Sequence, residues 1–470
     1  MSDDLAQLLR RIADHAVQYR ASVQEGPQRP ELAADEMRAR FDAPVPERGA
    51  PVAEVIEDLI ARAEGGLAAM AGPRFFGWVI GATEPAGMAA DWLASAWGQN
   101  CANYLATPAA SAVEEIAARW LLELMDLPRQ ASVGFVTGAT MANFTGLAAA
   151  RGEVLRRAGW DAEADGLFGA PPINVVLGEE AHSTVFSALK YLGLGTKRVV
   201  SVASDSEGRM KPSAFAAAIK PLSGPIIVIA QAGHINSGAF DPFAEIIPQA
   251  HAQGAWVHVD GAFGLWARAA RDVAPATAGV EQADSWGVDG HKWLQTPHDC
   301  GYAIVRDATA HHRAMQIAAS YLPARDGARH PADYVPELSR RARGFATWAM
   351  IRALGREGIA AMVSRHCALA RRFAQRLGRE GDIEIMNEVV LNQIAIRLGA
   401  DLEPGAADAL TQRTIENVQR GGECFVGGAE WHGRQIVRVS VISAGTTETD
   451  VDRSADAIVS AWRAVRGANS

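Results

Sequence analysis

Apolar residues in the first 80 or so positions recur at helical spacing, with one interruption. The opening residues, MSDDLAQLLRRIADHAVQYR, predict an amphipathic helix that is acidic at its start and basic further on. The stretch from Phe41 to Pro51 contains three prolines and is predicted to be a loop. The pattern therefore predicts a helical arm over residues 1–83.

Between residues 84 and 345, helical segments alternate with short apolar runs. The predicted strands are 173–177, 198–202, 226–230, 256–260 and 302–305. Strands that are apolar on both faces and separated by helices are typical of a mostly parallel sheet that helices cover on each side. We therefore predict a large α/β domain over residues 84–345.

The remaining residues give a different pattern. A long helix is predicted over 345–377, strands near 389–398 and 436–442, and a last helix from Thr449. This mixture predicts a small C-terminal α+β domain over residues 346–470.

Composition narrows the function. Of the 470 residues, 49% are hydrophobic and 21% charged, which suits a folded protein of two or three lobes. The net charge of -9, without a basic stripe, argues against a nucleic-acid partner. No run of 18 uncharged apolar residues and no signal-peptide pattern is found, so we expect a cytoplasmic protein without a membrane partner. The four cysteines lack CxxC spacing, so buried free thiols are expected and neither a metal nor a disulfide.

The run from Asp284 to Trp293 is the strongest chemical signal. It places Lys292 between His291 and Trp293, and a solvent-exposed lysine is less expected beside these two side chains. The alternative interpretation is an ordinary exposed lysine. A lysine shielded from water can form a Schiff base. About 30 residues upstream, Asp260 closes an apolar strand and offers the carboxylate that the ring nitrogen of pyridoxal phosphate (PLP) requires, although it could instead cap the next turn.

Two further segments suit the same cofactor. Gly138, Ala139 and Thr140 precede a predicted helix, whose exposed N–H groups could hold a phosphate; the alternative is a helix cap packed on a strand. His182 lies where a strand gives way to a helix. Its imidazole could stack on a cofactor ring, or it could be a cap or a surface residue.

These segments together resemble the group II PLP-dependent amino-acid decarboxylases, which include aromatic-L-amino-acid and glutamate decarboxylases and share fold type I with aspartate aminotransferase. The resemblance covers residue 70 to the C-terminus. It rests on Gly72-Pro-Arg-Phe-Phe76, Thr107-Pro-Ala-Ala-Ser-Ala-Val-Glu114, Thr137-Gly-Ala-Thr-Met-Ala-Asn143, Ala181-His182, His258-Val-Asp-Gly-Ala262 and the run from Asp284 to Trp293.

The resemblance implies a role for each site residue. Lys292 would form the internal aldimine, Asp260 would pair with the ring nitrogen, and His182 and Ala262 would lie on opposite faces of the ring. The residues implied around the phosphate and the rest of the cofactor are Gly138, Ala139, Thr140, His234, Asp289 and His291.

Two positions bear on the reaction. Tyr321 matches a loop tyrosine that helps protonate the substrate carbanion in decarboxylases, whereas aldehyde-forming relatives carry phenylalanine there; the alternative is a core tyrosine. His234 replaces a threonine that is common in the family. It could alter proton transfer, or it could be a neutral variant.

The substrate pocket implied by the resemblance contains Trp78, Val79, Tyr104 and His234. These residues favour an aromatic or bulky apolar L-amino acid, although tryptophan is also common in cores. We therefore expect PLP-dependent decarboxylation to an amine and CO2, in a homodimer with shared active sites. The alternatives are an aldehyde synthase or aminotransferase on the same fold, and a catalytically silent PLP-binding paralogue.

Overall fold

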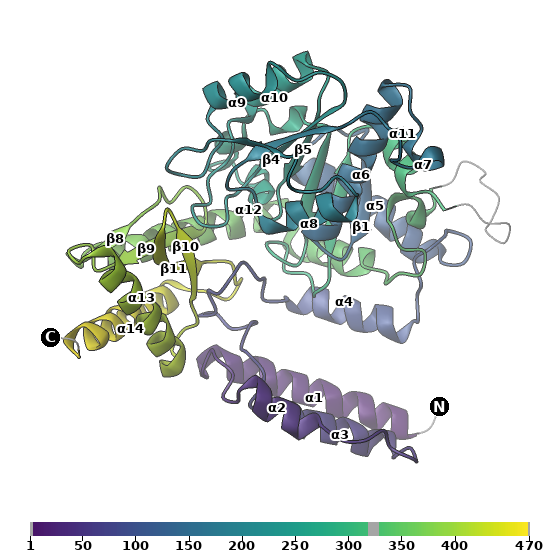
Figure 1. Ribbon diagram of the computed structural model, residues 1–470. Helices are drawn as coiled ribbons and strands as arrows, with labels where there is room; N and C mark the ends of the chain where they lie inside the picture. The colour runs from purple at the N-terminus through teal and green to yellow at the C-terminus, as the bar shows by residue number, and fades with distance from the viewer. Residues whose placement is uncertain (1–2, 318–328, 469–470) are drawn as a thin grey trace. The chain divides into compact units, whose positions relative to one another are not determined.

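A computed structural model describes residues 3–317 and 329–468 of the chain, which forms two compact units (Figure 1). The first unit comprises Met1–Ala82, Arg372–Ile385 and Ile396–Ser470. The second comprises Thr83–Arg371 and Met386–Ala395. The N-terminal segment therefore shares a unit with the C-terminal segment, while the division into domains at 83 and 345 stays a prediction.

The second unit is an α/β sheet structure. Its strands are β1 (Ser132–Val136), β2 (Asn174–Gly178), β3 (Val200–Val202), β4 (Ile226–Gln231), β5 (Trp256–Asp260), β6 (Ser285–Asp289) and β7 (Gly301–Val305). Its α-helices are α4 (Pro85–Ala96), α5 (Pro108–Leu124), α6 (Ala139–Arg157), α7 (Ala162–Asp165), α8 (Ser183–Tyr191), α9 (Pro212–Ile219), α10 (Phe243–Ala252) and α11 (Ala308–Met315). Short 3-10 helices are η1 (Gly264–Ala269), η2 (Ala274–Thr277), η3 (Val280–Gln282) and η4 (Pro331–Tyr334).

The seven strands are ordered β1-β7-β6-β5-β4-β2-β3. β7 is antiparallel to both of its neighbours, β1 and β6, and the remaining neighbouring strands of this sheet are parallel. The predicted mostly parallel sheet is therefore confirmed. β1 and β6 were not among the predicted strands, because glycine and serine interrupt their apolar runs, SVGFV and SWGVD.

α6 lies at the centre of this unit, in contact with β5, β6 and β7. Its middle turn, Leu147 to Ala150, is fully buried in a core that includes Ile227 and Trp256. Alanines along this face bring the helix close to the sheet. The amino terminus of α6 is thereby held at the edge where β1 ends.

The first unit contains the helical arm and a small sheet. Its helices are α1 (Asp3–Glu25), α2 (Ala34–Phe41), α3 (Val52–Ala63), α13 (Pro404–Gly421) and α14 (Glu448–Gly467). Its strands are β8 (Ile383–Ile385), β10 (Gly427–Trp431) and β11 (Arg434–Ser440), while α12 (Gly344–Leu377) and β9 (Gln393–Leu398) continue from one unit into the other. The sheet order is β10-β11-β9-β8, with β10–β11 and β8–β9 antiparallel, so the predicted helical arm and α+β part are present.

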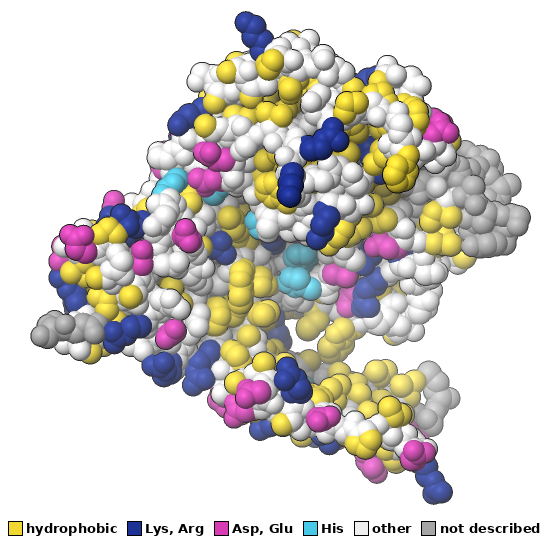
Figure 2. Space-filling view, viewed as in Figure 1, with side chains coloured by type: hydrophobic (Ala, Val, Ile, Leu, Met, Phe, Trp, Pro, Cys, Tyr) yellow, Lys and Arg dark blue, Asp and Glu magenta, His cyan; other side chains and the backbone are white. Residues whose placement is uncertain are grey.

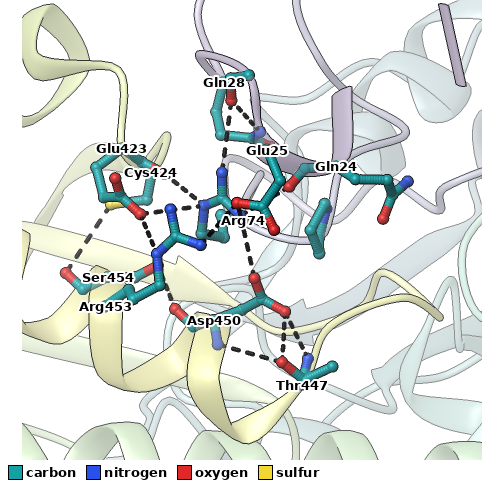
Figure 3. Close-up of polar contacts among 12 residues, drawn as sticks. Gln24, Glu25, Gln28, Arg74, Glu423, Cys424, Thr447, Asp450, Arg453 and Ser454 are labelled. Atoms are coloured by element: carbon teal, nitrogen blue, oxygen red, sulfur yellow. Dashed lines mark hydrogen bonds and ion pairs between the residues drawn. The ribbon is translucent and has the colours of Figure 1, made fainter. Parts of the chain in front are cut away.

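Arg74, from the Gly72–Phe76 motif, ties the end of α1 to α14 (Figure 3). Its side chain is 1% exposed. It donates hydrogen bonds to the carbonyl oxygens of Gln24 (2.8 Å) and Glu423 (2.9 Å) and contacts Asp450 Oδ1 at 3.1 Å. The motif therefore has a structural role in joining segments distant in the sequence.

Two further expectations can be compared with the described residues. All four cysteines are buried and none forms a disulfide, as predicted. Within residues 3–317 and 329–468, every helix is too short or too polar to span a bilayer.

Candidate active site

The predicted site residues gather at the edge where the parallel strands of the second unit end. β5 ends at Asp260 and β6 at Asp289, and Lys292 follows three residues later. α6 begins at Ala139 after β1, and α8 begins after His182, which follows β2. Ala139 N–H donates a hydrogen bond to Asp289 Oδ1 at 2.6 Å, so residues 150 positions apart in the sequence meet at this edge. Open α/β sheets bind their ligands at this edge.

Lys292 is held in a fixed turn. Its Nζ lies 2.8 Å from Asp289 Oδ2, and its side chain is 18% exposed. The Gln295 amide donates to the Lys292 carbonyl at 3.0 Å, and Trp293 Nε1 donates to His366 Nδ1 at 2.9 Å. This lysine is therefore largely shielded and paired, unlike a freely solvated surface lysine.

Asp260 is nearly buried, with 4% of its surface exposed. Burial raises the pKa of this carboxyl, and the nearby side chains of His182 and Lys292 partly offset that effect. Its Oδ1 accepts a hydrogen bond from the backbone N–H of Ala262 at 3.2 Å, so the predicted turn cap is also present. A buried carboxylate near Lys292 and His182 is a suitable partner for a protonated ring nitrogen.

His182 is the N-cap of α8, which was one of its two interpretations. Its Nδ1 accepts a hydrogen bond from Thr184 N–H at 3.4 Å and lies 2.8 Å from Thr184 Oγ1. Its own backbone N–H donates to Gln231 Oε1 at 3.0 Å. These contacts fix the orientation of the imidazole, which lies near enough to Asp260 to influence the pKa of that carboxyl. Capping is thus compatible with the predicted stacking role.

The amino terminus of α6 contains the predicted phosphate contacts, whose role stays a prediction. A Cβ added at Gly138 would lie 3.0 Å from His291 Cε1 and 3.2 Å from Asp289 Oδ1, so glycine is needed for this close approach. Burial lowers the pKa of His291, and its Nδ1 accepts the Cys300 N–H at 3.2 Å. The neutral ring therefore carries its proton on Nε2, as a donor. Thr140 is partly exposed in the first turn of the helix.

Asp289 places a negative charge among these donors. Burial raises the pKa of this carboxyl, but the ammonium of Lys292, the nearby imidazole of His291 and the hydrogen bonds from Lys292 and Ala139 outweigh burial, so the pKa lies below its usual value. Asp289 is therefore ionised. It accepts the hydrogen bond of the Ala139 N–H, a donor at the helix amino terminus that would otherwise favour a phosphate. In its predicted role as a cofactor contact, Asp289 would therefore also repel the cofactor phosphate.

His234 is paired with a residue that the sequence did not indicate. Its Nε2 lies 3.0 Å from Glu180 Oε2, and its side chain is 4% exposed. Asn236 N–H donates to His234 Nδ1 at 3.3 Å, which places the ring proton on Nε2, toward the carboxylate. Glu180 lies two residues before His182 in the sequence, and this proximity to a predicted site residue was the signal that could have indicated Glu180.

The remaining predicted residues are distributed differently. Tyr104 lies in the second unit, with its ring 5.1 Å from that of His330. Trp78 and Val79 belong to the first unit, where Trp78 is 51% exposed and stacks on Phe425 at 5.6 Å, and Val79 is buried. Their role in a pocket stays a prediction. Tyr321 lies outside the described residues.

The sequence also gave no indication of a buried polar chain beneath Asp260. It contains Asn143, His258 and Ser285, all fully buried. His258 precedes Asp260 by two positions in β5, and alternate residues of a strand share a face. That periodicity was the signal that could have revealed it.

Taken as a set, these groups fit PLP. Lys292 supplies an amine, Asp260 a buried carboxylate, and the α6 amino terminus supplies N–H groups next to a glycine that permits close approach. The ionised Asp289 is the one group that opposes an anion.

Comparison with known proteins decides the family. Residues 34–399 match the pyridoxal-dependent decarboxylase conserved domain. The chain belongs to the pyridoxal-dependent decarboxylase family. Its cofactor is pyridoxal phosphate, and it is a carboxy-lyase acting on an amino acid, as the resemblance implied.

Individual relatives support this assignment. The chain is 30% identical to L-2,4-diaminobutyrate decarboxylase of Rhizobium meliloti (strain 1021), over 79% of this chain and 74% of the relative. It is 24% identical to aromatic-L-amino-acid decarboxylase of Bacillus atrophaeus, over 96% and 94% of the two chains. A crystal structure of Oryza sativa TDC with PLP and tryptamine matches with a TM-score of 0.91, at 24% identity over 99% of this chain and 98% of that chain. The predicted fold class is therefore confirmed.

Proposed function

We propose that this decarboxylase acts on an L-amino acid with an aromatic or bulky apolar side chain and releases the amine and CO2. The observation that carries the proposed site is the position of Asp260, Lys292 and His182 at one edge of the sheet, at or after the ends of β5, β6 and β2. Sites at this edge are built from loops that the sheet holds rigidly.

Each group has a distinct task. Lys292 attaches the cofactor, Asp260 holds the proton on its ring nitrogen, and the His182 ring supports its face. The bound cofactor supplies an electron sink for the bond that breaks. The chain must hold the α-carboxylate bond perpendicular to the ring plane, because only then do its electrons enter the ring system.

Aromatic residues support the proposed substrate class. Trp78 forms a cluster with Phe75 and Phe425, with ring centroids 6.2 and 5.6 Å from that of Trp78. Tyr104 contributes a further ring in the second unit. Such surfaces suit a flat apolar side chain. We propose Trp78, Val79, Tyr104 and His234 as contacts of the substrate side chain.

The test is an assay of the holoenzyme with all L-amino acids and common aromatic derivatives. CO2, amine and hydrogen peroxide are measured together. We expect one amine per CO2 and no peroxide, with the highest kcat/KM for an aromatic or bulky apolar substrate. Peroxide formation would identify an aldehyde synthase, a keto-acid requirement an aminotransferase, and no turnover despite full cofactor loading a silent paralogue.

A second measurement tests the attachment point independently of the substrate. Lys292→Ala should lose the visible absorption band of the covalently bound cofactor, because no other amine would replace Lys292. A variant that kept the band would reject Lys292 as the attachment point.

We also propose that the protein is a cytoplasmic homodimer whose subunits share their active sites. The helical arm supports this proposal, because large apolar side chains are exposed along it (Figure 2). They are Leu5, Leu9 and Val17 of α1 and Val52, Val55 and Leu59 of α3. Exposed apolar helices of this kind are commonly covered by a second copy of the chain.

A further inference from the structure

A fully buried chain of polar side chains leads from the interior of the second unit to Asp260. Asn143 from α6, His258 from β5 and Ser285 from β6 are all 0% exposed, and Trp256, where the chain begins, is 1% exposed. None of these residues was among the predicted site residues. Buried polar groups are unfavourable unless they are satisfied, so a continuous chain of them calls for a function.

The direction of each hydrogen bond is determined. Trp256 Nε1 can only donate, and it lies 2.9 Å from Ser285 Oγ. The Ser285 hydroxyl then donates to His258 Nδ1 at 2.8 Å. His258 therefore carries its proton on Nε2, which donates to Asn143 Oδ1 at 3.0 Å. Burial lowers the pKa of His258 to about 3, so the ring is neutral, as this pattern requires.

The chain ends at Asp260. Because His258 occupies the oxygen of the Asn143 amide, the amide must present its N–H groups on the other side. That nitrogen is buried and meets no acceptor at full hydrogen-bond geometry among the described residues. Burial raises the pKa of Asp260, and hydrogen bonding from the Asn143 side chain is one of the effects that oppose the rise. The Asn143 amide therefore lies close enough to Asp260 to act on its carboxylate.

Two glycines make room for this arrangement. A Cβ at Gly146 of α6 would lie 2.8 Å from His258 Nδ1, and a Cβ at Gly287 of β6 would lie 2.4 Å from Asn143 Oδ1. Glycine weakens the interior of both helices and strands. Its presence at both positions indicates that close approach to the polar chain is required.

We propose that Asn143 and His258, oriented by Ser285 and Trp256, are positioning residues that hold the Asp260 carboxylate toward the cofactor ring nitrogen. This inference rests on the proposed pairing of Asp260 with that nitrogen. Were His258 to adopt the other tautomer, the amide would turn its oxygen toward Asp260 and repel the carboxylate. Ser285, by donating to His258 Nδ1, favours the tautomer in which His258 Nε2 binds the Asn143 oxygen and the amide N–H groups are left for Asp260.

The experiment uses holoenzyme reconstituted with PLP carrying 15N at its ring nitrogen. The variants are Asn143→Leu, His258→Leu, His258→Gln and Ser285→Ala. Two readouts are the 15N chemical shift of the ring nitrogen and the pH dependence of the cofactor absorption band. Neither depends on turnover, and both respond to how firmly Asp260 holds the ring proton.

We expect Asn143→Leu and His258→Leu to move the 15N shift toward that of an unprotonated ring. They should also lower kcat by roughly tenfold or more while KM changes little, as loss of a supporting hydrogen bond does at other catalytic sites. Glutamine can donate from its Nε2 as His258 does, so His258→Gln should restore most of the wild-type signal. Ser285→Ala, which leaves the packing nearly intact, should give a smaller shift in the same direction.

His311 provides a matched control. It is also 0% exposed, burial lowers its pKa to about 3, and its Nδ1 also lies 2.8 Å from a serine, Ser132. His311→Leu should lower Tm as much as His258→Leu does, with an unchanged 15N shift. If all four test variants kept the wild-type 15N shift and pH profile and lost only stability, the chain would be structural and the proposal wrong.

The proposed pairing of Asp260 with the cofactor ring nitrogen, on which the positioning role rests, is tested separately with Asp260→Asn. A wild-type 15N shift in that variant would reject the proposed role of Asp260. A changed shift in Asp260→Asn, with none in Asn143→Leu, His258→Leu or Ser285→Ala, would reject the positioning chain alone.

Discussion

At the scale of single residues, the site combines two buried carboxylates with opposite behaviour. Burial raises the pKa of both Asp260 and Asp289, but the ammonium of Lys292, 2.8 Å away, and further donors reverse the effect at Asp289. The chemistry thus depends on neighbours that residue identity alone does not reveal. The sequence indicated both acids, but not their different environments.

Asp289→Asn should strengthen cofactor binding. The amide still accepts the Ala139 N–H, but the charge that opposes the phosphate is removed. We expect the PLP dissociation constant to fall on the order of tenfold, measured by titration of the absorption band. Asp299→Asn is the control, because Asp299 is paired with Arg343 instead. Weaker binding by Asp289→Asn would contradict this electrostatic role.

At the scale of elements, the continuously apolar strands were predictable, whereas strands interrupted by glycines or polar residues were not. β2, β4, β5 and β7 overlap the predicted runs, whereas β1, β6 and β10 contain glycines or polar residues. In β6 these are Ser285, which orients His258, and Gly287, which makes room for Asn143. The residues that obscured the strand are therefore the ones that the interior of the site uses. The polar helix α13 also went unpredicted.

The predicted long helix is present as α12, but it is interrupted at Gly355, where φ is 64° and ψ is 176°. That conformation is almost restricted to glycine, so Gly355→Ala should lower the free energy of unfolding by about 1–3 kcal/mol. A Cβ there would meet nothing within 4 Å, so the loss is purely conformational. Gly358→Ala, three residues on and without a positive φ, should instead stabilise by about 0.5–1 kcal/mol. Urea unfolding distinguishes them, and equal effects would reject this explanation.

The connection between α1 and α14 depends on one guanidinium. Arg74→Met leaves Asp450 without its buried cation and two carbonyl groups without a donor, so we expect a loss of about 3–5 kcal/mol in unfolding free energy. Arg453→Met removes the ion pairs to Glu423 and Glu25 at an exposed position and should cost less than about 1 kcal/mol. If both variants lost similar unfolding free energies in denaturant titrations, burial would not explain how much each arginine contributes to stability.

At the scale of the whole molecule, stability should decrease as the pH falls from 6.5. Burial lowers the pKa of His258 and His311 to about 3 and that of His298 to about 4, so the unfolded chain binds protons that the folded chain does not. Each contributes a slope of up to about 1.4 kcal/mol per pH unit. Asp241, whose pKa burial raises to about 6, acts in the opposite sense.

This pH dependence can be assigned by urea unfolding between pH 7 and pH 4.5. We expect a positive slope of unfolding free energy against pH in the wild type and a shallower one in His311→Leu, because that variant lacks one of the suppressed protonations. An unchanged slope would mean that His311 is not neutral in the folded protein.

The proposed dimer can also be tested at this scale. Leu9 and Val17 of α1 are 55% and 70% exposed, so Leu9→Glu with Val17→Glu should place charges in the interface and give a monomer in sedimentation velocity. Gln7→Glu adds a charge to the same helix at an exposed polar residue and should leave a dimer. A wild-type monomer would reject the proposed assembly.

The antiparallel strand β7 has a consequence for the order of folding. It lies between β1 and β6, and Ser132 of β1 is bonded to Val305 of β7 across 173 residues. A Cβ at Gly301 would lie 2.6 Å from Gly138, so the start of β7 abuts the start of α6. Contacts between such distant segments form late, because a long loop must close first. The cofactor should therefore bind only after this unit has folded. The visible absorption band of the bound cofactor would then measure the fraction of fully folded chains.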